Sequence, residues 1–337
     1  MVSLTPFLAV LFLVGTVAGR AAALWSCWCL DGVRNTGLIR CTGCGTRIRR
    51  RQQLVGAILP GKCRICGSRD VTWPVITMIL TGLLFAGFGW LLVFQGCQTV
   101  TEVRPAGPLW QGRLPFHLMF LFLMLTATLT DLLDYTIPDA VVGLGTVIAI
   151  VGATASGELQ MIHIWVSWDD TMVSLYGPYL PDWMKQHQHL HGLAWSVAGS
   201  AAGAGLTGIV RVTAGGILGY PAVGLGDVTL MAMIGAFMGW QPVLCVLAIA
   251  PVGGIAIGTL IRVITGRSFV AFGPYLTFAA VVVLCCWNLL WERMELRNIF
   301  GHGPTIAGMT TAALGVLCLV LTGLRIFRTL PTDVMKR

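Results

Sequence analysis

The chain has 337 residues, of which 22 are Lys or Arg, 14 are Asp or Glu, and 56% are hydrophobic. A soluble domain carries about 25% charged residues, and disordered chains are rich in charge; the 11% found here excludes both classes. The net charge of +8 fits the enrichment of Lys and Arg in cytoplasmic loops of membrane proteins. Because no basic run is interleaved with stacking aromatic residues, we expect no nucleic-acid partner. The composition predicts an all-α polytopic protein embedded in the lipid bilayer.

Nine apolar segments are candidates for transmembrane helices, since a helix needs about 20 apolar residues to span the bilayer. They are Leu4–Leu24, Thr72–Phe94, Leu114–Leu133, Ile137–Ala155, Leu193–Val212, Val228–Trp240, Val243–Ile261, Phe269–Trp287 and Ile306–Phe327. The sequence Gly239-Trp240-Gln241-Pro242 favours a turn between the sixth and seventh segments. The first segment could be a cleaved signal peptide, but no positive charge precedes Arg20, which favours a retained helix.

The stretch 25–71 sets the expected orientation. It holds nine Arg or Lys residues against Asp31 and Asp70, and by the positive-inside rule it is cytoplasmic. The N-terminus then lies outside, nine crossings place the C-terminus in the cytoplasm, and the loop 157–192 lies on the far side.

The same stretch contains two C-x-x-C pairs, Cys41-Thr-Gly-Cys44 and Cys63-Arg-Ile-Cys66. Two such pairs can close a tetrahedron of four thiolates around zinc, and disulfides would not persist in the reducing cytosol. We therefore predict a small cytoplasmic insert with a structural zinc ion at Cys41, Cys44, Cys63 and Cys66. The alternative is four structural cysteines without a metal.

Three acids lie where the third segment joins the fourth. Asp139 follows Pro138, which fits the first turn of a helix, and there an acid complements the helix dipole. Asp134 fits a solvated turn at the interface. Asp131 follows an apolar run that begins at Leu118, and an acid at membrane depth is a functional hypothesis by default.

The sixth segment opens with Gly224-Leu-Gly226-Asp227. Asp227 could simply be the N-cap of the next helix. Alternatively, Gly224 and Gly226, which lack a Cβ, would let an extended substrate peptide approach beside the acid.

The predicted topology connects Asp131 with Asp227. The third helix ends in the cytoplasm and the sixth begins there, which puts both acids at similar depth on one face of the membrane. Two carboxyl groups brought together in a low dielectric cannot both ionise, so they share a proton. Such a pair can act as an aspartyl protease, in which one carboxylate takes a proton from water while the other, protonated, polarises the scissile carbonyl.

The sequence resembles the bacterial type IV prepilin peptidases, which are intramembrane aspartyl proteases of the GxGD type. Four features carry the resemblance, and they occur in the family's order. They are the paired C-x-x-C motifs, Asp131 seven residues before Pro138, Gly224-Leu-Gly226-Asp227, and Phe272-Gly273-Pro274-Tyr275-Leu276.

The resemblance implies that Asp131 and Asp227 are the catalytic pair in a bacterial inner-membrane protein. It implies cleavage of the short leader of pilin-like precursors at the cytoplasmic face, just after a glycine. Many members then N-methylate the new terminus with S-adenosylmethionine. Here the spacer between the cysteine pairs is shorter than usual, the first helix ends in Gly19-Arg20, and Thr229 stands where a lysine commonly follows the second aspartate. These departures concern methylation more than proteolysis.

We expect four parts: a first helix (1–24), the zinc-binding loop domain (25–71), the protease core (72–287) and an extra helix with a cytoplasmic tail (288–337). Within the loop 157–192, His187, His189 and His191 could bind a metal from one strand face, although a solvated polar loop fits them better. Gly199-x3-Gly203, Gly235-x3-Gly239 and Gly254-x3-Gly258 are typical of helix-packing seams.

Two other functions remain possible. A transporter could couple protons or cations to the same two aspartates, and a membrane-tethered zinc scaffold would need neither.

Overall fold

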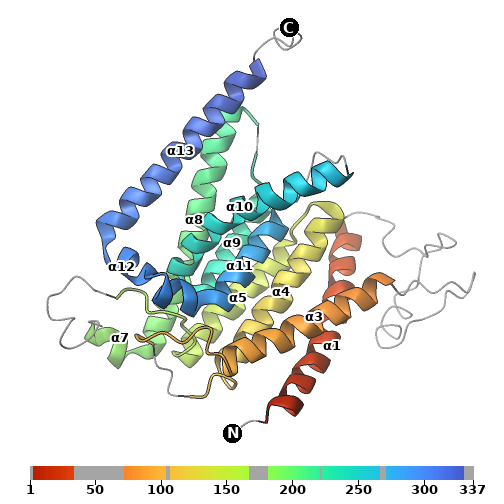
Figure 1. The fold of residues 1–337 in the computed structure, drawn as a ribbon, viewed down its shortest axis with the longest axis vertical. Helices are drawn as coiled ribbons and strands as arrows, with labels where there is room; N and C mark the ends of the chain where they lie inside the picture. The colour runs from red at the N-terminus through yellow and green to blue at the C-terminus, as the bar shows by residue number, and fades with distance from the viewer. Residues whose placement is uncertain are drawn as a thin grey trace, which may run out of the picture. The chain divides into compact units, whose positions relative to one another are not determined.

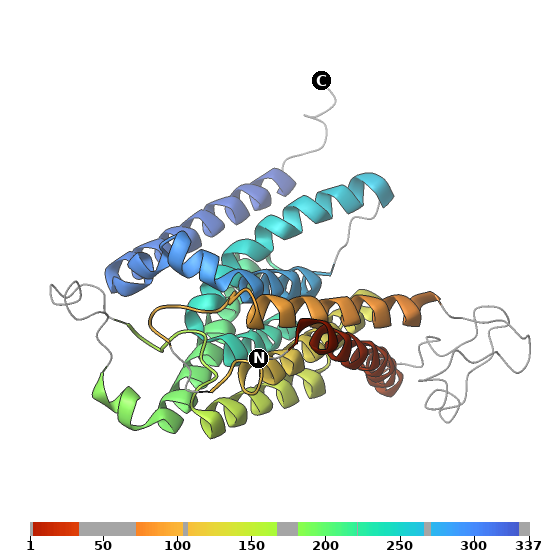
Figure 2. The ribbon, with the colours of Figure 1, turned by 60° about the horizontal axis from the view of Figure 1, so that its bottom comes forward.

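The computed structural model describes residues 3–33, 72–103, 107–166, 181–220, 222–265 and 271–329. These residues are nearly all helical, and within the described ranges the only extended pairing is an isolated bridge between Val100 and Val103. The prediction of an all-α polytopic membrane protein is confirmed. Figures 1 and 2 show the helices in two views.

Eight of the described helices are long and apolar enough to cross a membrane. They are α1 (Leu4–Val33), α3 (Thr72–Val93), α4 (Arg113–Asp134), α5 (Asp139–Ser156), α8 (Gln188–Leu218), α10 (Trp240–Thr265), α11 (Gly273–Asn288) and α13 (Gly303–Thr329). α11 reaches this length because its span continues through a π-helical turn to Arg293. The segment α9 (Leu225–Met238) is also apolar but has only 14 residues. These nine helices correspond to the nine predicted segments. Three short elements complete the described part: α7 (Asp182–Gln186), α12 (Leu296–Gly301) and a π-helical turn (Leu289–Arg293).

Two helices extend well beyond the predicted apolar segments. α1 continues to Val33 instead of ending at Leu24, and α8 begins at Gln188 instead of Leu193. At about 1.5 Å per residue, α8 is roughly 46 Å long and exceeds the hydrocarbon thickness of about 30 Å. Hydropathy identifies only the part of a helix that is apolar enough for lipid. It therefore predicts a loop at polar helix ends such as Gln188–His191.

The predicted turn between the sixth and seventh segments is confirmed. α9 ends at Met238, and Gly239 adopts a φ of +88° before α10 starts at Trp240. Such a backbone conformation strains any residue with a Cβ, which explains the glycine.

The chain forms two compact units, each described here by itself. Unit 1 comprises Met1–Gln98, Pro105–Gly145 and Leu247–Cys285; unit 2 comprises Thr99–Arg104, Thr146–Val246 and Cys286–Arg337. The helices α5, α10 and α11 each pass from one unit into the other.

In unit 1, α1 and α3 lie side by side (Figures 1 and 2). A Cβ on Gly15 or Gly19 of α1 would come within 2.7 Å of a backbone oxygen of α3, at Thr81 and Thr77 respectively. α1 also contacts α4, where the hydroxyl of Ser26 donates to the carbonyl of Thr126 at 3.2 Å.

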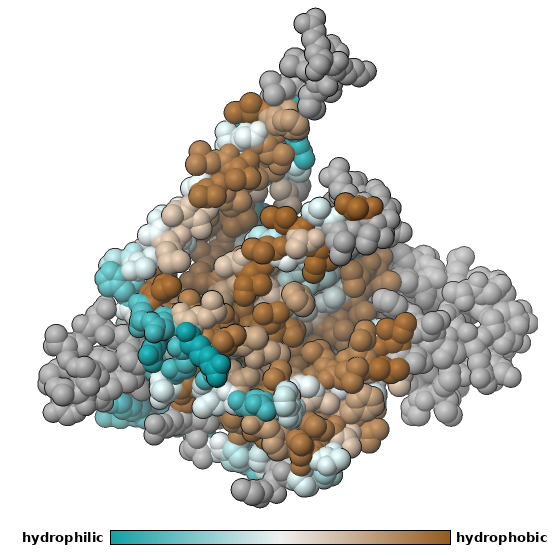
Figure 3. Space-filling view, in the orientation of Figure 1, coloured by the Kyte–Doolittle hydropathy of each residue, from teal (hydrophilic) through white to brown (hydrophobic). Residues whose placement is uncertain are grey.

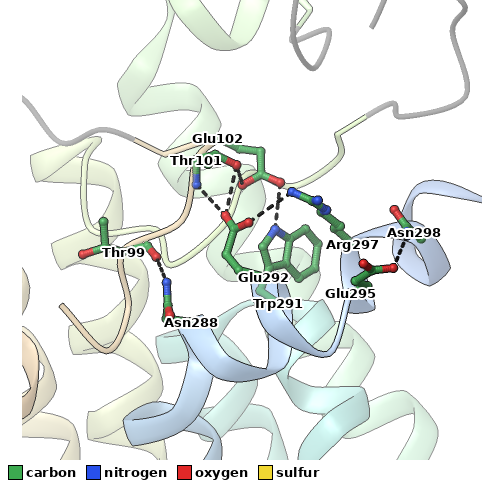
Figure 4. Close-up of polar contacts among 9 residues, drawn as sticks. All are labelled: Thr99, Thr101, Glu102, Asn288, Trp291, Glu292, Glu295, Arg297 and Asn298. Atoms are coloured by element: carbon green, nitrogen blue, oxygen red, sulfur yellow. Dashed lines mark hydrogen bonds and ion pairs between the residues drawn. The ribbon is translucent and has the colours of Figure 1, made fainter. Parts of the chain in front are cut away.

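In unit 2, a polar network connects residues 99–102 to the π-helical turn (Figure 4). The indole N–H of Trp291 donates to the buried carboxylate of Glu102 at 2.8 Å. Glu292 accepts the backbone N–H of Thr101 at 2.8 Å and pairs with Arg297 at 3.1 Å. A buried carboxylate needs such donors, because leaving it unsatisfied is costly.

The extra C-terminal helix α13 packs against α8 in unit 2. None of its most apolar 18-residue stretch is buried, and hydrophobic surface covers the face of α13 seen in Figure 3. Met309, Val316 and Leu319 are among its exposed side chains. A helix that keeps apolar residues on its open face suits a lipid environment.

Candidate active site

Asp131 lies in the last turn of α4, in unit 1, and is only 6% exposed. The helix ends three residues later, because Tyr135 adopts the left-handed conformation (φ 54°) and its N–H caps the carbonyl of Asp131 at 2.9 Å. The predicted position at a helix end is confirmed, and the carboxyl group belongs to the buried face of α4.

The motif around Gly273 contacts Asp131 directly. Gly273 is the first residue of α11. A Cβ built there would collide with Oδ2 of Asp131 and lie 3.2 Å from its Cγ and 3.3 Å from Cδ1 of Ile137. Glycine at this position therefore leaves room for the carboxyl group.

Two threonines hold the start of α11 close to Asp131. The hydroxyl of Thr128, one turn before Asp131 on α4, donates to the hydroxyl of Thr277 on α11 at 2.9 Å. Thr277 in turn donates to the carbonyl of Gly273 at 3.1 Å. The start of α11 is thereby hydrogen-bonded to the end of α4. These threonines were missed in the sequence, since single hydroxyls in apolar helices give no distinctive pattern.

Tyr275 of the same motif lies beside the glycine pair of α10. A Cβ on Gly254 would lie 3.6 Å from the ring of Tyr275, and one on Gly258 would lie 3.7 Å from its hydroxyl oxygen. Tyr275 is 7% exposed. These are ordinary van der Waals distances, so α10 packs against Tyr275 at Gly254 and Gly258 without the close approach that would require glycine.

Asp227 lies in unit 2, in the first turn of α9, and is 9% exposed. The N-cap is Gly224, and Asp227 is the third helical residue. Its Oδ2 accepts the backbone N–H of Gly224 at 3.1 Å, which is half of a capping box. The interpretation of Asp227 as the N-cap is therefore wrong, since the carboxylate reaches back to the cap residue instead.

The two glycines of this motif both precede the buried acid. Gly224 is exposed and Gly226 is half-buried. A Cβ on Gly224 would lie 3.2 Å from Oδ2 of Asp227, tighter than ordinary contact. Thr229, at the position where a lysine is common, uses its hydroxyl to donate to the carbonyl of Gly226 at 3.0 Å.

Close backbone packing against α8 supports α9. A Cβ on Gly199 or Gly235 would overlap the carbonyl oxygen of the other residue, and one on Gly203 would overlap that of Met231. The prediction of a glycine seam is confirmed for Gly199, Gly203 and Gly235. Gly239 belongs to the seam as well as to the turn, because a Cβ there would collide with the ring of Trp195 of α8.

The three histidines do not share a face. His187 precedes α8, and His189 and His191 lie in its first turn. Alternate residues of a helix point in different directions. His189 and His187 are exposed, whereas His191 is buried, with its ring nitrogens contacting Nε2 of Gln160 and the backbone N–H of Ile164, both at 3.2 Å. The expectation of a solvated loop is wrong for His191. Within the described ranges no three metal-binding side chains form a cluster.

Cys41, Cys44, Cys63 and Cys66 lie outside the described residues. The two aspartates belong to different units, so their pairing stays a prediction from the topology.

Residues 118–259 match the model of the type IV leader peptidase family. Over this stretch the chain is therefore similar to the type IV leader peptidases. Both Asp131 and Asp227 lie inside the matched stretch, while the cysteine pairs and Gly273 lie outside it.

Two curated proteins are similar to this chain. A prepilin leader peptidase/N-methyltransferase of Neisseria gonorrhoeae is 22% identical over 263 residues, covering 76% of this chain and 73% of the relative. A protein of the same name from Escherichia coli (strain K12) is 32% identical over 91 residues, covering 26% of this chain and 40% of the relative. No solved structure matches the chain.

Proposed function

We propose that this chain is an intramembrane aspartyl endopeptidase that removes the leader peptide of type IV prepilin-like precursors. The observation that carries the proposal is that two buried carboxyl groups, Asp131 and Asp227, lie at helix ends inside the stretch that matches the leader peptidase family. The names of the two similar proteins supply the prepilin substrate.

In the proposed reaction one aspartate accepts a proton from water while the other, protonated, donates a hydrogen bond to the scissile carbonyl. The water oxygen adds to that carbonyl, the peptide C–N bond breaks, and the departing amine takes up a proton. The pair titrates as one unit, so the two roles are not assigned to individual residues.

The shortness of α9 supports a substrate site at membrane depth. Its 14 residues span about 21 Å, against a hydrocarbon layer of about 30 Å. At least one end of α9 therefore lies within that layer. Irregular backbone at such depth is tolerated where it is buried in protein or lines a polar cavity. We propose that the Asp227 end, with exposed Gly224 beside it, receives the extended peptide.

The rival functions have weaker support. A proton- or cation-coupled transporter and a zinc scaffold would both explain an apolar, polytopic chain. The family match to leader peptidases, which includes both aspartates, favours the peptidase.

The remaining features belong to the proposal as well. We propose a structural zinc ion held by Cys41, Cys44, Cys63 and Cys66 in a cytoplasmic insert. N-methylation with S-adenosylmethionine is proposed from the relatives' names. We propose an inner-membrane protein with its N-terminus outside and its C-terminus in the cytoplasm.

Co-expression with a prepilin from the same source tests this function. The peptidase proposal expects a shortened precursor with wild-type protein, and an intact leader would overturn it. Mass spectrometry of the mature N-terminus tests methylation, and an unmodified amine with saturating S-adenosylmethionine would contradict that part alone. Proton uptake into vesicles that contain the protein would instead support the transporter.

A further inference from the structure

A single peptide group connects Arg211 of α8 with Asp227 of α9. The guanidinium of Arg211 donates to the carbonyl oxygen of Val223. The N–H of the same peptide bond belongs to Gly224, and it donates to Oδ2 of Asp227 at 3.1 Å. In a planar trans peptide the C=O and N–H point in opposite directions, so Arg211 and Asp227 bind opposite edges of one rigid group.

We propose that Arg211 is a positioning residue, which orients the carboxyl group of Asp227 through the Val223–Gly224 peptide; this inference rests on the proposed peptidase function.

The surrounding chain explains why this peptide needs to be held. α8 ends at Leu218, where Gly219 adopts a φ of +78°, and α9 begins at Leu225. The peptide before α9 therefore belongs to a short connection, and the guanidinium of Arg211 reaches it from α8. A charged donor makes a stronger hydrogen bond than a neutral one, and linked hydrogen bonds polarise each other. The Gly224 N–H is therefore held in one orientation and donates a stronger hydrogen bond to Asp227.

The burial and charge of Arg211 support the assignment. Arg211 is half-buried in a helix that is long and apolar enough to cross a membrane. A charged side chain there is costly and marks a functional position by default. This rule applied to the sequence would have identified Arg211, which the motif analysis missed.

The arrangement has a chemical consequence. The Gly224 N–H holds Oδ2 of Asp227, which leaves Oδ1 to act on water or on the scissile carbonyl. Without Arg211 the peptide can turn, and the carboxyl group loses its fixed orientation. A misplacement of about 1 Å can cost roughly 100-fold in rate. Substrate binding should change little, because Arg211 bonds to the protein's own backbone.

Steady-state kinetics of leader removal by purified variants test the assignment. Arg211→Met should lower kcat about 10- to 100-fold with KM within about twofold of wild type. Arg211→Lys keeps a charged donor and should recover part of kcat. Arg325→Met, which replaces an exposed arginine of α13, is the matched control and should leave kcat unchanged. A change in KM alone, or equal loss in Arg211→Lys and Arg211→Met, would overturn the proposal.

Amide hydrogen exchange supplies a measurement that does not depend on activity. Exchange at Gly224 should accelerate in Arg211→Met and stay near wild type in Arg211→Lys and Arg325→Met. Unchanged exchange in Arg211→Met would overturn the proposed connection whether or not the protein is a peptidase. If wild-type protein is inactive but shows the expected exchange pattern, the proposed function is contradicted. The role of Arg211 in catalysis is then contradicted too, whereas its hydrogen-bonded connection to Asp227 stands. Arg211→Gln replaces Arg211→Met in both measurements if the methionine variant does not fold, with the same loss of kcat expected because the charge is gone.

Discussion

Gly273 and Asp131 are in such close contact that no other residue fits at position 273 without moving the carboxyl group. The two residues are 142 positions apart in the sequence and come from α11 and α4. The contact gives a physical role to the motif Phe272-Gly273-Pro274-Tyr275-Leu276, which the sequence suggested only by resemblance.

Gly273→Ala should therefore reduce leader removal strongly. The new methyl group collides with Oδ2 of Asp131, so we expect a loss in kcat of about 10- to 100-fold. The initial rate with a prepilin substrate measures it. Gly253→Ala is the matched control, because a Cβ at this glycine of α10 meets no atom within 4 Å. Equal rates for Gly273→Ala and wild type would contradict the proposed constraint.

Two substitutions at Gly224 separate its hydrogen bond from its small size. Its φ of −66° suits proline, but proline removes the N–H that Asp227 accepts and places a ring carbon there. We expect Gly224→Pro to abolish leader removal. Gly224→Ala keeps the N–H and adds a Cβ 3.2 Å from Oδ2, so it should retain measurable activity. Similar activity of the alanine and proline variants would show that the N–H does not matter.

The seam between α8 and α9 should respond to added volume. Gly199→Ala forces its Cβ into the carbonyl oxygen of Gly235, and overpacking of this kind costs about 1–3 kcal/mol. Thermal unfolding in detergent should show a lower midpoint than wild type. Gly205→Ala, on the same helix with open space around its Cβ, should not lower the midpoint. A midpoint for Gly199→Ala equal to that of Gly205→Ala would contradict the seam.

The fold was largely predictable, because apolar length alone identifies a helix that lies in lipid. All nine predicted segments correspond to helices, and glycine identified the turn at Gly239. The errors occurred at polar helix ends. Gln188–His191 continue α8 although their side chains are polar, since hydropathy measures suitability for lipid and not helicity.

The candidate site was predictable only in part. Asp131 and Asp227 were recognised because carboxyl groups are rare and costly in an apolar chain. The contacts of Thr128 with Thr277 and of Arg211 with Val223 join residues that are distant in sequence or involve the backbone. Neither kind of contact leaves a local sequence pattern, so both could be recognised only in the structure.

The zinc prediction concerns cysteines outside the described residues. Metal analysis of the purified protein should find about one zinc per chain, since four thiolates complete a tetrahedral structural site. Cys63→Ser should lose this zinc and lower the unfolding temperature. Cys318→Ser, in α13, is the control and should keep the metal. Wild-type protein without bound metal would contradict the prediction.

The central claim is that Asp131 and Asp227 together cleave the leader. The most direct measurement is leader removal from a synthetic prepilin segment by purified protein in lipid vesicles, followed by mass spectrometry. Asp131→Asn and Asp227→Asn should each abolish cleavage, because an amide can neither accept the proton of water nor share one. Asp139→Asn, at an exposed acid in the first turn of α5, should cleave like wild type. Cleavage by either Asp131→Asn or Asp227→Asn at the wild-type rate would contradict the account.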